Sequence, residues 1–248
     1  MKKLSTSLVT ALAVIVSLTL PACNKTGQHL PDDIDKLCRI DTITVDGQQI
    51  KVSYNAAGDP ASMLPVPPII IHGPAFNNIY FQYDKYDRLI AYLNFYSTNS
   101  FPDFSQKFSY PEPRVIIDTI FNIDVTGPPS VVRYDLDEKG RTIKTTTLAP
   151  LPRTSFTTSY DKNGNWIRTD ADYDDKINVY RTSKTWQLLF QDYSRNNPIP
   201  DLIPAYNAAG LPLHYQATAA NSHPHLFFYY EFFSLSLSYT CDIPGKHP

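Results

Sequence analysis

Alternation of apolar and polar side chains is the most frequent pattern along this chain, and it is typical of strands with one buried face. In the clearest case, residues 43–45 alternate up to Asp46-Gly47, and residues 50–54 alternate away from it. Because Asp-Gly supplies the positive φ angles of a type I′ turn, this segment predicts a β-hairpin.

Further strands follow from the same pattern. Residues 79–83 and 89–96 predict a second pair of strands, residues 115–125 another strand, and residues 226–241 a last one. In the last strand, six large apolar side chains share one face, namely Phe227, Tyr229, Phe233, Leu235, Leu237 and Tyr239. Burial of that face is therefore expected.

One helix is predicted over residues 183–197. Ser183 is a suitable N-cap, and apolar side chains then recur at helical spacing, at Trp186, Leu189, Phe190 and Tyr193. Pro198 ends the segment, because the residue before a proline avoids the helical conformation. Two proline-rich stretches, residues 59–78 and 97–114, interrupt the strands, and we interpret them as surface loops.

A loose repeat links many of the predicted strands. A Tyr followed by Asp or Asn leads into a few turn-forming residues, often with Gly four positions after the Tyr. The pairs are Tyr54-Asn55, Tyr83-Asp84, Tyr134-Asp135, Tyr160-Asp161 and Tyr206-Asn207, followed by Gly58, Asp87, Gly140, Gly164 and Gly210, with a longer turn before Gly140. The Asp or Asn side chain is expected to cap the turn, and Gly to adopt the left-handed conformation.

These Tyr-[Asp/Asn]-x-x-x-Gly units resemble the YD repeats of the RHS family, and more closely those of small YD-repeat lipoproteins of Bacteroidota. The resemblance covers most of residues 50–218, with irregular spacing between units. It implies antiparallel β-hairpins and a location in the cell envelope, but no particular activity. Large RHS proteins build shells around toxins, and this chain is far too short for that.

The N-terminus has the features of an export signal. A positively charged start precedes an apolar run at residues 8–20, which suits a signal peptide and is too short to cross a bilayer as a helix. The run ends in Leu-Pro-Ala-Cys, which resembles the lipobox of bacterial lipoproteins. We therefore expect residues 1–22 to be a lipoprotein signal peptide, Cys23 the lipid attachment site and residues 23–37 a polar tether. Secretion without lipidation is the alternative.

Residues 38–248 are expected to form one all-β, mainly antiparallel domain, built as a curled meander of hairpins with one short helix. The 17 Tyr and 13 Phe favour strands, and the 21 Pro punctuate them. Once Cys23 is acylated, Cys38 and Cys241 remain as an even pair in an oxidising compartment, which predicts a disulfide. Two buried free thiols are the alternative.

The net charge and the aromatic content limit the classes of binding partner that we expect. The net charge is −2 without a basic run, so no nucleic-acid partner is expected. The aromatic residues either fill the core, which is the favoured interpretation, or form an exposed platform for a glycan, peptide or protein ligand.

Three groups of residues offer chemistry by type. His72-Gly73-Pro74 is similar to the oxyanion segment of hydrolases, but the chain contains no G-x-S-x-G, so we interpret it as a turn. His214, His223 and His225 are suitable metal ligands, although loop histidines are the simpler interpretation.

The third group consists of carboxylates and amides that suit calcium, at Asp161, Asn163, Asn165, Asp170, Asp172, Asp174 and Asp175. Gly164 stands at the fourth position of such a loop rather than the sixth, and the Glu at its end is absent. Hairpin turn chemistry accounts for the same residues. The sequence therefore predicts no metal, no cofactor and no catalytic residue.

Together these features predict a non-catalytic lipoprotein of the outer membrane with a binding or structural role. Its partners would be the membrane, reached through the N-terminal lipid, and a glycan, peptide or protein ligand. Both the periplasmic and the surface face stay open. The alternative is an extracytoplasmic hydrolase that acts on envelope or environmental polymers through paired carboxylates.

Overall fold

In the part of the chain that the structure describes, thirteen strands form one antiparallel sheet. The computed structural model describes residues 38–66, 77–95, 102–122, 127–150, 152–169, 171–198, 202–203, 205–216 and 233–241. The strands are β1 (Cys38–Val45), β2 (Gln48–Tyr54), β3 (Pro60–Val66), β4 (Asn78–Tyr83), β5 (Leu89–Phe95), β6 (Phe104–Glu112), β7 (Val115–Asn122), β8 (Ser130–Leu136), β9 (Thr142–Ala149), β10 (Ser155–Thr157), β11 (Ala205–Tyr206), β12 (Pro212–Gln216) and β13 (Ser234–Cys241). A 3-10 helix, η1 (Val179–Thr182), and an α-helix, α2 (Lys184–Phe190), follow β10 in the sequence. The predicted fold class, an antiparallel meander of hairpins with one short helix, is confirmed.

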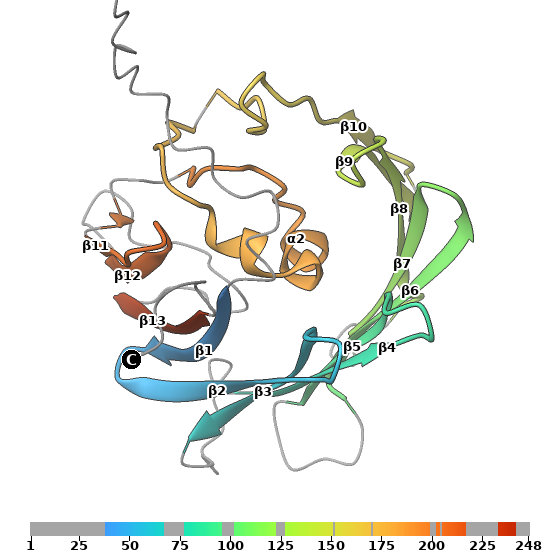
Figure 1. Ribbon diagram of the computed structural model, residues 1–248. Helices are drawn as coiled ribbons and strands as arrows, with labels where there is room; N and C mark the ends of the chain where they lie inside the picture. Colours follow the sequence, from blue (N-terminus) through green and yellow to red (C-terminus); the bar gives the residue numbers. More distant parts are fainter. Residues whose placement is uncertain are drawn as a thin grey trace, which may run out of the picture. The chain divides into compact units, whose positions relative to one another are not determined.

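Among the described strands, neighbours in the sheet are also neighbours in the sequence, except where β1 pairs with β13. The order is β10-β9-β8-β7-β6-β5-β4-β3-β2-β1-β13-β12-β11, and the sheet curves around α2 (Figure 1). β13 pairs with β1 so that Cys38 lies opposite Cys241 and Val45 opposite Leu235. The first and last strands are therefore neighbours inside an open sheet, whose edges among the described strands are β10 and β11.

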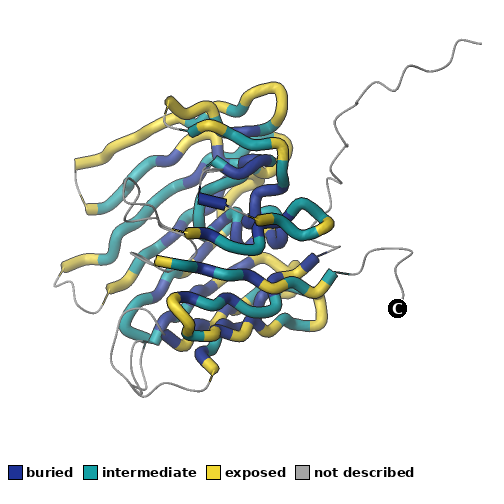
Figure 2. Tube along the Cα trace, turned by 90° about the vertical axis from the view of Figure 1, so that its left-hand side faces the viewer, coloured by how far each residue is buried: buried dark blue, intermediate teal, exposed yellow. Residues whose placement is uncertain are grey.

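The inner face of the sheet and α2 share one core. Buried positions alternate with accessible ones along the strands, as Figure 2 shows along the tube. The indole of Trp186 is fully buried, and the ring of Phe81 meets it edge-on at 5.4 Å between centroids. The hydroxyl of Tyr83 lies 3.0 Å from Thr185 Oγ1, so β4 contacts α2 by both a polar and an apolar contact.

Five turns repeat the same hydrogen bonds. In each turn the first residue, an Asp or Asn, pairs its backbone N–H with the carbonyl four residues later, and its carbonyl accepts the N–H three residues later. Its side-chain oxygen also accepts the N–H four residues later; these residues are Asn55, Asp84, Asp137, Asp161 and Asn207. The fourth residue of each turn has positive φ, and it is Gly in every turn except the one with Asp87 (φ 57). The predicted turn chemistry is thus confirmed.

One of the predicted turn caps is wrong. Asp137, rather than Asp135, begins the turn that reaches Gly140, and Leu136 precedes it where the other four turns have a Tyr. Asp135 instead lies within β8, paired with Lys144, and accepts a hydrogen bond from Arg133. The position three residues before the residue with positive φ therefore locates the capping Asp or Asn better than the Tyr-Asp dipeptide does.

Each of these turns is bound by a tyrosine from a later strand or segment. The tyrosine hydroxyl donates to the carbonyl of the first residue after the turn, over 2.6 to 3.0 Å. The pairs are Tyr83 with Pro60, Tyr110 with Leu89, Tyr160 with Thr142, Tyr173 with Trp166, and Tyr239 with Pro212. Two of these five tyrosines, Tyr83 and Tyr160, are also tyrosines of the repeat. Each of the five keeps its ring half-buried while its hydroxyl reaches the neighbouring backbone rather than water.

Two segments interpreted as loops contain strands. Within residues 59–78, β3 begins at Pro60, and Pro65 lies beyond the part of β3 that pairs with β4. Within residues 97–114, β6 pairs with β5 and β7, and its proline stands near the end, where the register shifts. Proline is tolerated at strand starts, ends and irregularities, so its presence did not break either strand. Residues 67–76 and 96–101 lie outside the described part.

The helix is shorter than predicted. Ser183 caps α2 by accepting the N–H of Thr185 at 3.1 Å, as expected. However, α2 ends at Phe190, because Gln191 adopts the left-handed conformation with φ 51. Phe233 also departs from expectation: it is 81% exposed, although Leu235 and Leu237 on its predicted face are buried. Residues 123–126 and 217–232, which include Phe227 and Tyr229, lie outside the described residues.

Candidate functional site

A basic pocket of about 450 Å³ is the best candidate for a binding site in the described part of the chain. Six cationic side chains line it: Lys139, Arg141, Lys162, Arg181, Lys184 and Arg195. The other lining residues are Asp161, Asn163, Gly164, Gln187 and Tyr193, so none of the described walls is aliphatic. This concentration of positive charge contrasts with the net charge of −2 of the whole chain.

Two of the repeated turns build one side of the pocket. In the turn that begins at Asp137, the Oδ1 atom of Asp137 accepts the N–H of Lys139 and of Arg141, both at 2.9 Å. Its Oδ2 atom accepts two hydrogen bonds from the guanidinium of Arg141, at 2.9 and 2.7 Å. The guanidinium carbon also lies 4.0 Å from the centre of the Tyr160 ring. Arg141 is therefore fixed in direction by a carboxylate and an aromatic face.

The second turn, residues 161–165, is tied to the segment that carries Arg195. The carbonyl of Gly164 accepts the N–H of Arg195 at 3.3 Å. Asn165 and Asn196 bond reciprocally, since Asn165 Nδ2 donates to Asn196 Oδ1 at 3.0 Å and Asn196 N donates to Asn165 Oδ1 at 2.9 Å. Both asparagines are buried, so this clamp holds Arg195 close to the turn.

The helical segments supply further lining residues. Arg181 comes from η1, and Lys184 and Gln187 come from α2. Asn178 caps η1 by accepting the N–H of Tyr180 at 3.0 Å, and Ser183 caps α2. Because Val179, Trp186 and the residues around them are buried in the core, these cations are carried on a rigid frame.

The pocket contains one ionisable acid among its described residues, Asp161. Its Oδ1 atom already accepts the N–H groups of Asn163 and Asn165, both at 2.8 Å. Tyr193 is the one aromatic lining residue, and burial raises its pKa to about 12. The pocket therefore offers cations and neutral hydrogen-bonding groups, a combination that suits the binding of an anion.

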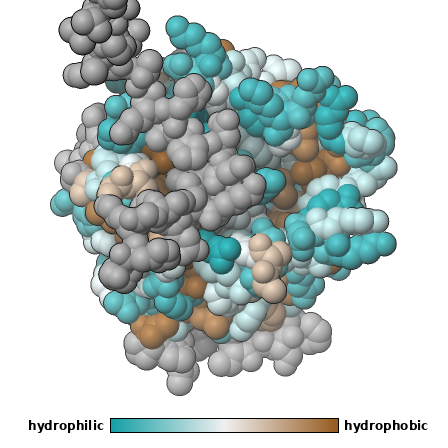
Figure 3. Space-filling view, viewed as in Figure 1, coloured by the Kyte–Doolittle hydropathy of each residue, from teal (hydrophilic) through white to brown (hydrophobic). Residues whose placement is uncertain are grey.

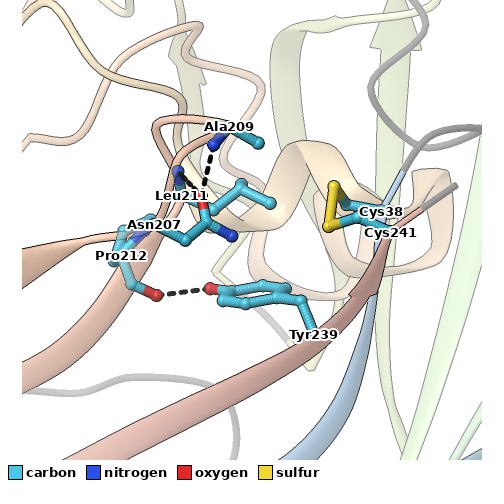
Figure 4. Close-up of a disulfide and its surroundings, with 7 residues drawn as sticks. All are labelled: Cys38, Asn207, Ala209, Leu211, Pro212, Tyr239 and Cys241. Carbon is cyan, nitrogen blue, oxygen red and sulfur yellow. Dashed lines mark hydrogen bonds between the residues drawn. A yellow bond between two sulfur atoms is a disulfide. The ribbon is translucent and has the colours of Figure 1, made fainter. Parts of the chain in front are cut away.

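The predicted disulfide pair lies at the β1–β13 junction. The Sγ atoms of Cys38 and Cys241 are 2.13 Å apart, at disulfide distance, and the Cα atoms are 4.0 Å apart. Figure 4 shows the pair beside the turn that begins at Asn207, where the hydroxyl of Tyr239 reaches the carbonyl of Pro212 at 2.6 Å. The predicted lipid site, Cys23, lies outside the described residues.

The other sequence candidates are not brought together into a site. His214 lies on β12 with Nδ1 2.9 Å from Ser236 Oγ, while His72, His223 and His225 lie outside the described residues. Asp174 is used structurally, because its carboxylate accepts bonds from the backbone and side chain of Asn197, from the backbone of Lys176 and from the hydroxyl of Tyr206. Within the described ranges, no group of three or more His, Cys, Asp or Glu is placed to hold a metal ion. Asp170 is outside those ranges.

The aromatic residues mainly serve the core. Trp186, Tyr92 and Tyr215 are among the largest fully buried side chains. The exposed rings come from separate strands and turns, as with Tyr86 at 65% and Phe156 at 55% exposure. On the face drawn in Figure 3, hydrophilic residues predominate over the described part, with smaller hydrophobic patches between them.

Sequence reasoning missed the basic pocket. Its cations lie between residues 139 and 195 without forming a basic run, so neither the net charge nor a local motif reveals them. A weak signal was available, because the turns that begin at Asp137 and Asp161 each carry a lysine, at Lys139 and Lys162.

Comparison with known proteins does not assign the chain. No model of a known protein family matches it, and no curated protein matches its sequence. In the described residues, no helix has the length and apolar character needed to cross a membrane.

Proposed function

We propose that this chain is a non-catalytic lipoprotein of the outer membrane, anchored through Cys23, that binds an anionic ligand in the basic pocket. The observation that carries the proposal is the convergence of six cationic side chains from two turns, η1, α2 and the segment at Arg195 on one cavity. A cleft lined by one sign of charge concentrates ligands of the opposite sign. The size of the cavity is within the range typical of small-molecule sites.

The lipid anchor and the family resemblance belong to the same proposal. The lipobox-like sequence before Cys23 supports anchoring. The five related turns support the resemblance to YD-repeat lipoproteins, because the same hydrogen bonds recur in each around an Asp or Asn. A Tyr precedes this residue in four of the turns, and Gly is the fourth residue in four of them. The proposal holds for a domain on the periplasmic face of the outer membrane and for one on its outer surface.

The pocket gives less support to the hydrolase alternative. A glycosidase places two carboxyl groups on either side of the scissile bond. Among the described lining residues the one carboxylate is Asp161, and its Oδ1 atom is occupied by two amide N–H groups of its own turn.

Binding of polyanions to the full-length chain tests the proposal. Dextran sulfate, polyglutamate and polyphosphate would be titrated against the protein in detergent, with neutral dextran as the uncharged reference. We expect at least one polyanion to bind, and its affinity to fall as salt is raised from about 0.05 to about 0.3 M. Lys162→Glu should weaken that binding. Lys85→Glu should leave it unchanged, because Lys85 holds the same position in the turn of Asp84, away from the pocket.

Two results would contradict the proposal. The first is that none of the three polyanions binds more tightly than neutral dextran. The second is that Lys162→Glu and Lys85→Glu weaken binding equally, which would place the interaction on the surface in general rather than in the pocket.

A further inference from the structure

The arrangement of charge around the pocket, rather than its total, indicates what kind of anion fits. The cations come from three groups of residues: the turn at 137–141, the turn at 161–165 with Arg195 bonded to it, and η1 with α2. A ligand with a single anionic group would engage one of these groups. A ligand that uses all of them must carry several anionic groups.

The cationic character of the lining favours a multivalent anion. Asp161 lies in the pocket, and Asp137 is joined to Arg141 in a two-bond ion pair. The six cations of the lining outnumber these two carboxylates. A ligand with two or more phosphate or sulfate groups suits such a lining.

The walls exclude ligands that depend on apolar contacts. The neutral lining side chains are Asn163, Gln187 and Tyr193, which donate and accept hydrogen bonds. Peptides gain affinity by burying apolar anchors, and nucleobases by stacking on aromatic rings. The described walls carry no aliphatic side chain and a single aromatic ring. A ligand that presents hydroxyl groups therefore matches them better than a peptide or a nucleobase does.

We propose that the basic pocket binds a compact polyhydroxylated oligoanion: a sugar or cyclitol that carries two or more phosphate or sulfate groups. This rests on the proposed function and names its ligand class. The arginines of the lining carry planar guanidinium groups, a shape that matches tetrahedral oxyanions, and the lysines carry point charges. A Cβ built on Gly164 would lie 3.9 Å from both Arg141 Nη1 and Arg195 Cβ, so the turn at this glycine lies close to both arginines.

Isothermal titration calorimetry of the full-length chain in detergent tests the class directly. The probes are sucrose octasulfate and inositol hexakisphosphate, each with its uncharged parent, sucrose or inositol. Inorganic phosphate serves as the comparison with a single anionic group, and hexaglutamate as the comparison with an acidic peptide. We expect at least one of the two probes to bind on the order of tenfold more tightly than phosphate or hexaglutamate, and the parents not to bind.

Two matched pairs of variants place the ligand in the pocket. Arg141→Gln should weaken binding on the order of tenfold, whereas Arg88→Gln should not. Arg88 makes the same contacts with Asp84 and the ring of Tyr110 that Arg141 makes with Asp137 and Tyr160, but it lies outside the pocket. Lys184→Glu should also weaken binding without loss of folding, because an acidic residue in the first turn of α2 is favourable.

The outcomes separate this inference from the proposed function. If hexaglutamate binds as tightly as both probes, the ligand class is wrong, although an anion site exists. If Arg88→Gln weakens binding as much as Arg141→Gln, the location is wrong. If no anion binds, both proposals fail.

The same ligand chemistry has two sources, a free saccharide or the phosphorylated sugar headgroup of a glycolipid. Flotation of the full-length Cys23→Ser chain with phosphatidylcholine vesicles, with and without lipid A, distinguishes them. Binding to lipid A vesicles that inositol hexakisphosphate displaces assigns a headgroup. Binding of the free probes without flotation assigns a free saccharide. Flotation that neither probe displaces contradicts the pocket as the site.

Discussion

Cys38 and Cys241 face each other across the β1–β13 pair, with their Cα atoms 4.0 Å apart and 203 residues apart in sequence. We expect them to be oxidised in the exported protein. Thiol labelling of the denatured, unreduced full-length Cys23→Ser chain should then find no free cysteine. Replacing both with Ala should lower the free energy of unfolding by up to about 5 kcal/mol, because the closed loop is long. Labelling of two cysteines in the Cys23→Ser chain would contradict the pairing.

Lipidation at Cys23 predicts a change in partitioning. The wild-type chain should enter the detergent phase of a Triton X-114 separation, because more than one acyl chain anchors a protein firmly. The Cys23→Ser variant should move to the aqueous phase. Cys38→Ser, which leaves the lipobox-like sequence intact, is the control and should stay with the detergent. An aqueous wild-type chain would rule out the anchor.

The tyrosine hydroxyls that bind the turns should each contribute to stability. Tyr110→Phe and Tyr160→Phe remove the donors to the carbonyls of Leu89 and Thr142 and should each cost about 1 kcal/mol in urea unfolding. Tyr86→Phe is the control, since Tyr86 is 65% exposed. Equal effects of all three variants would show that the hydroxyl–carbonyl bonds contribute nothing.

Backbone conformation in the turns makes a separate prediction. Gly164 and Gly210 have φ angles of 89° and 80°, so replacing either with Val should cost about 1–2 kcal/mol or more. Asp87 occupies the same turn position with φ 57, and Asp87→Gly should leave the free energy of unfolding unchanged or slightly raised. Chemical denaturation measures both. A neutral Gly164→Val would mean that the turn tolerates a side chain there.

The buried carboxyl group of Asp118 should make the protein less stable as pH rises toward neutrality. Asp118 is 1% exposed, and burial raises its pKa from 3.8 to about 7. Between these values the unfolded chain loses the proton while the folded chain keeps it, so the free energy of unfolding falls with increasing pH. Burial also raises the pKa of Asp192, which acts in the same direction.

Asp118→Asn should therefore flatten the pH dependence between pH 4 and pH 7 and raise stability at pH 7.5. Gln106 Nε2 donates to Asp118 Oδ2 at 3.2 Å, and Tyr134 Oη lies 3.4 Å from the same oxygen. Asp172→Asn, at an exposed position, is the control. Thermal unfolding at a series of pH values provides the measurement, and an unchanged slope in Asp118→Asn would disprove the assignment.

Local chemistry in the sequence predicted the turns well, because Asp or Asn caps and positive-φ glycines act over five residues. Asp46-Gly47 forms the expected type of hairpin turn, with φ angles of 47° and 90°. The prolines in residues 59–78 and 97–114 favour loops by type, which hides strands β3 and β6, although Phe104 and Phe108 both point toward the core. The end of α2 differs from the prediction because Gln191, which is not a typical helix-stop residue, adopts the left-handed conformation.

The basic pocket was invisible for a different reason. Its residues belong to segments that the curvature of the sheet and the Asn165–Asn196 clamp bring together. A sequence pattern can place Lys162 in a turn and Lys184 at a helix start, but not both around one cavity. The pairing of Cys38 with Cys241 could be predicted because the expected export, the pair of cysteines that remains once Cys23 is set aside, and their placement at the two ends of the domain all favoured it.

The hydroxyl of Tyr239 reaches backward to a turn that was made before it, as the other four turn-binding tyrosines do. During synthesis, each turn thus emerges from the ribosome before the residue that secures it. Among the described strands β13 comes last, and it completes both the turn at Asn207 and the open side of β1, the first of them to be made. The earliest described strand must therefore wait for the final one, so a truncation that removes β13 would leave the beginning of the domain, rather than only its end, unfinished.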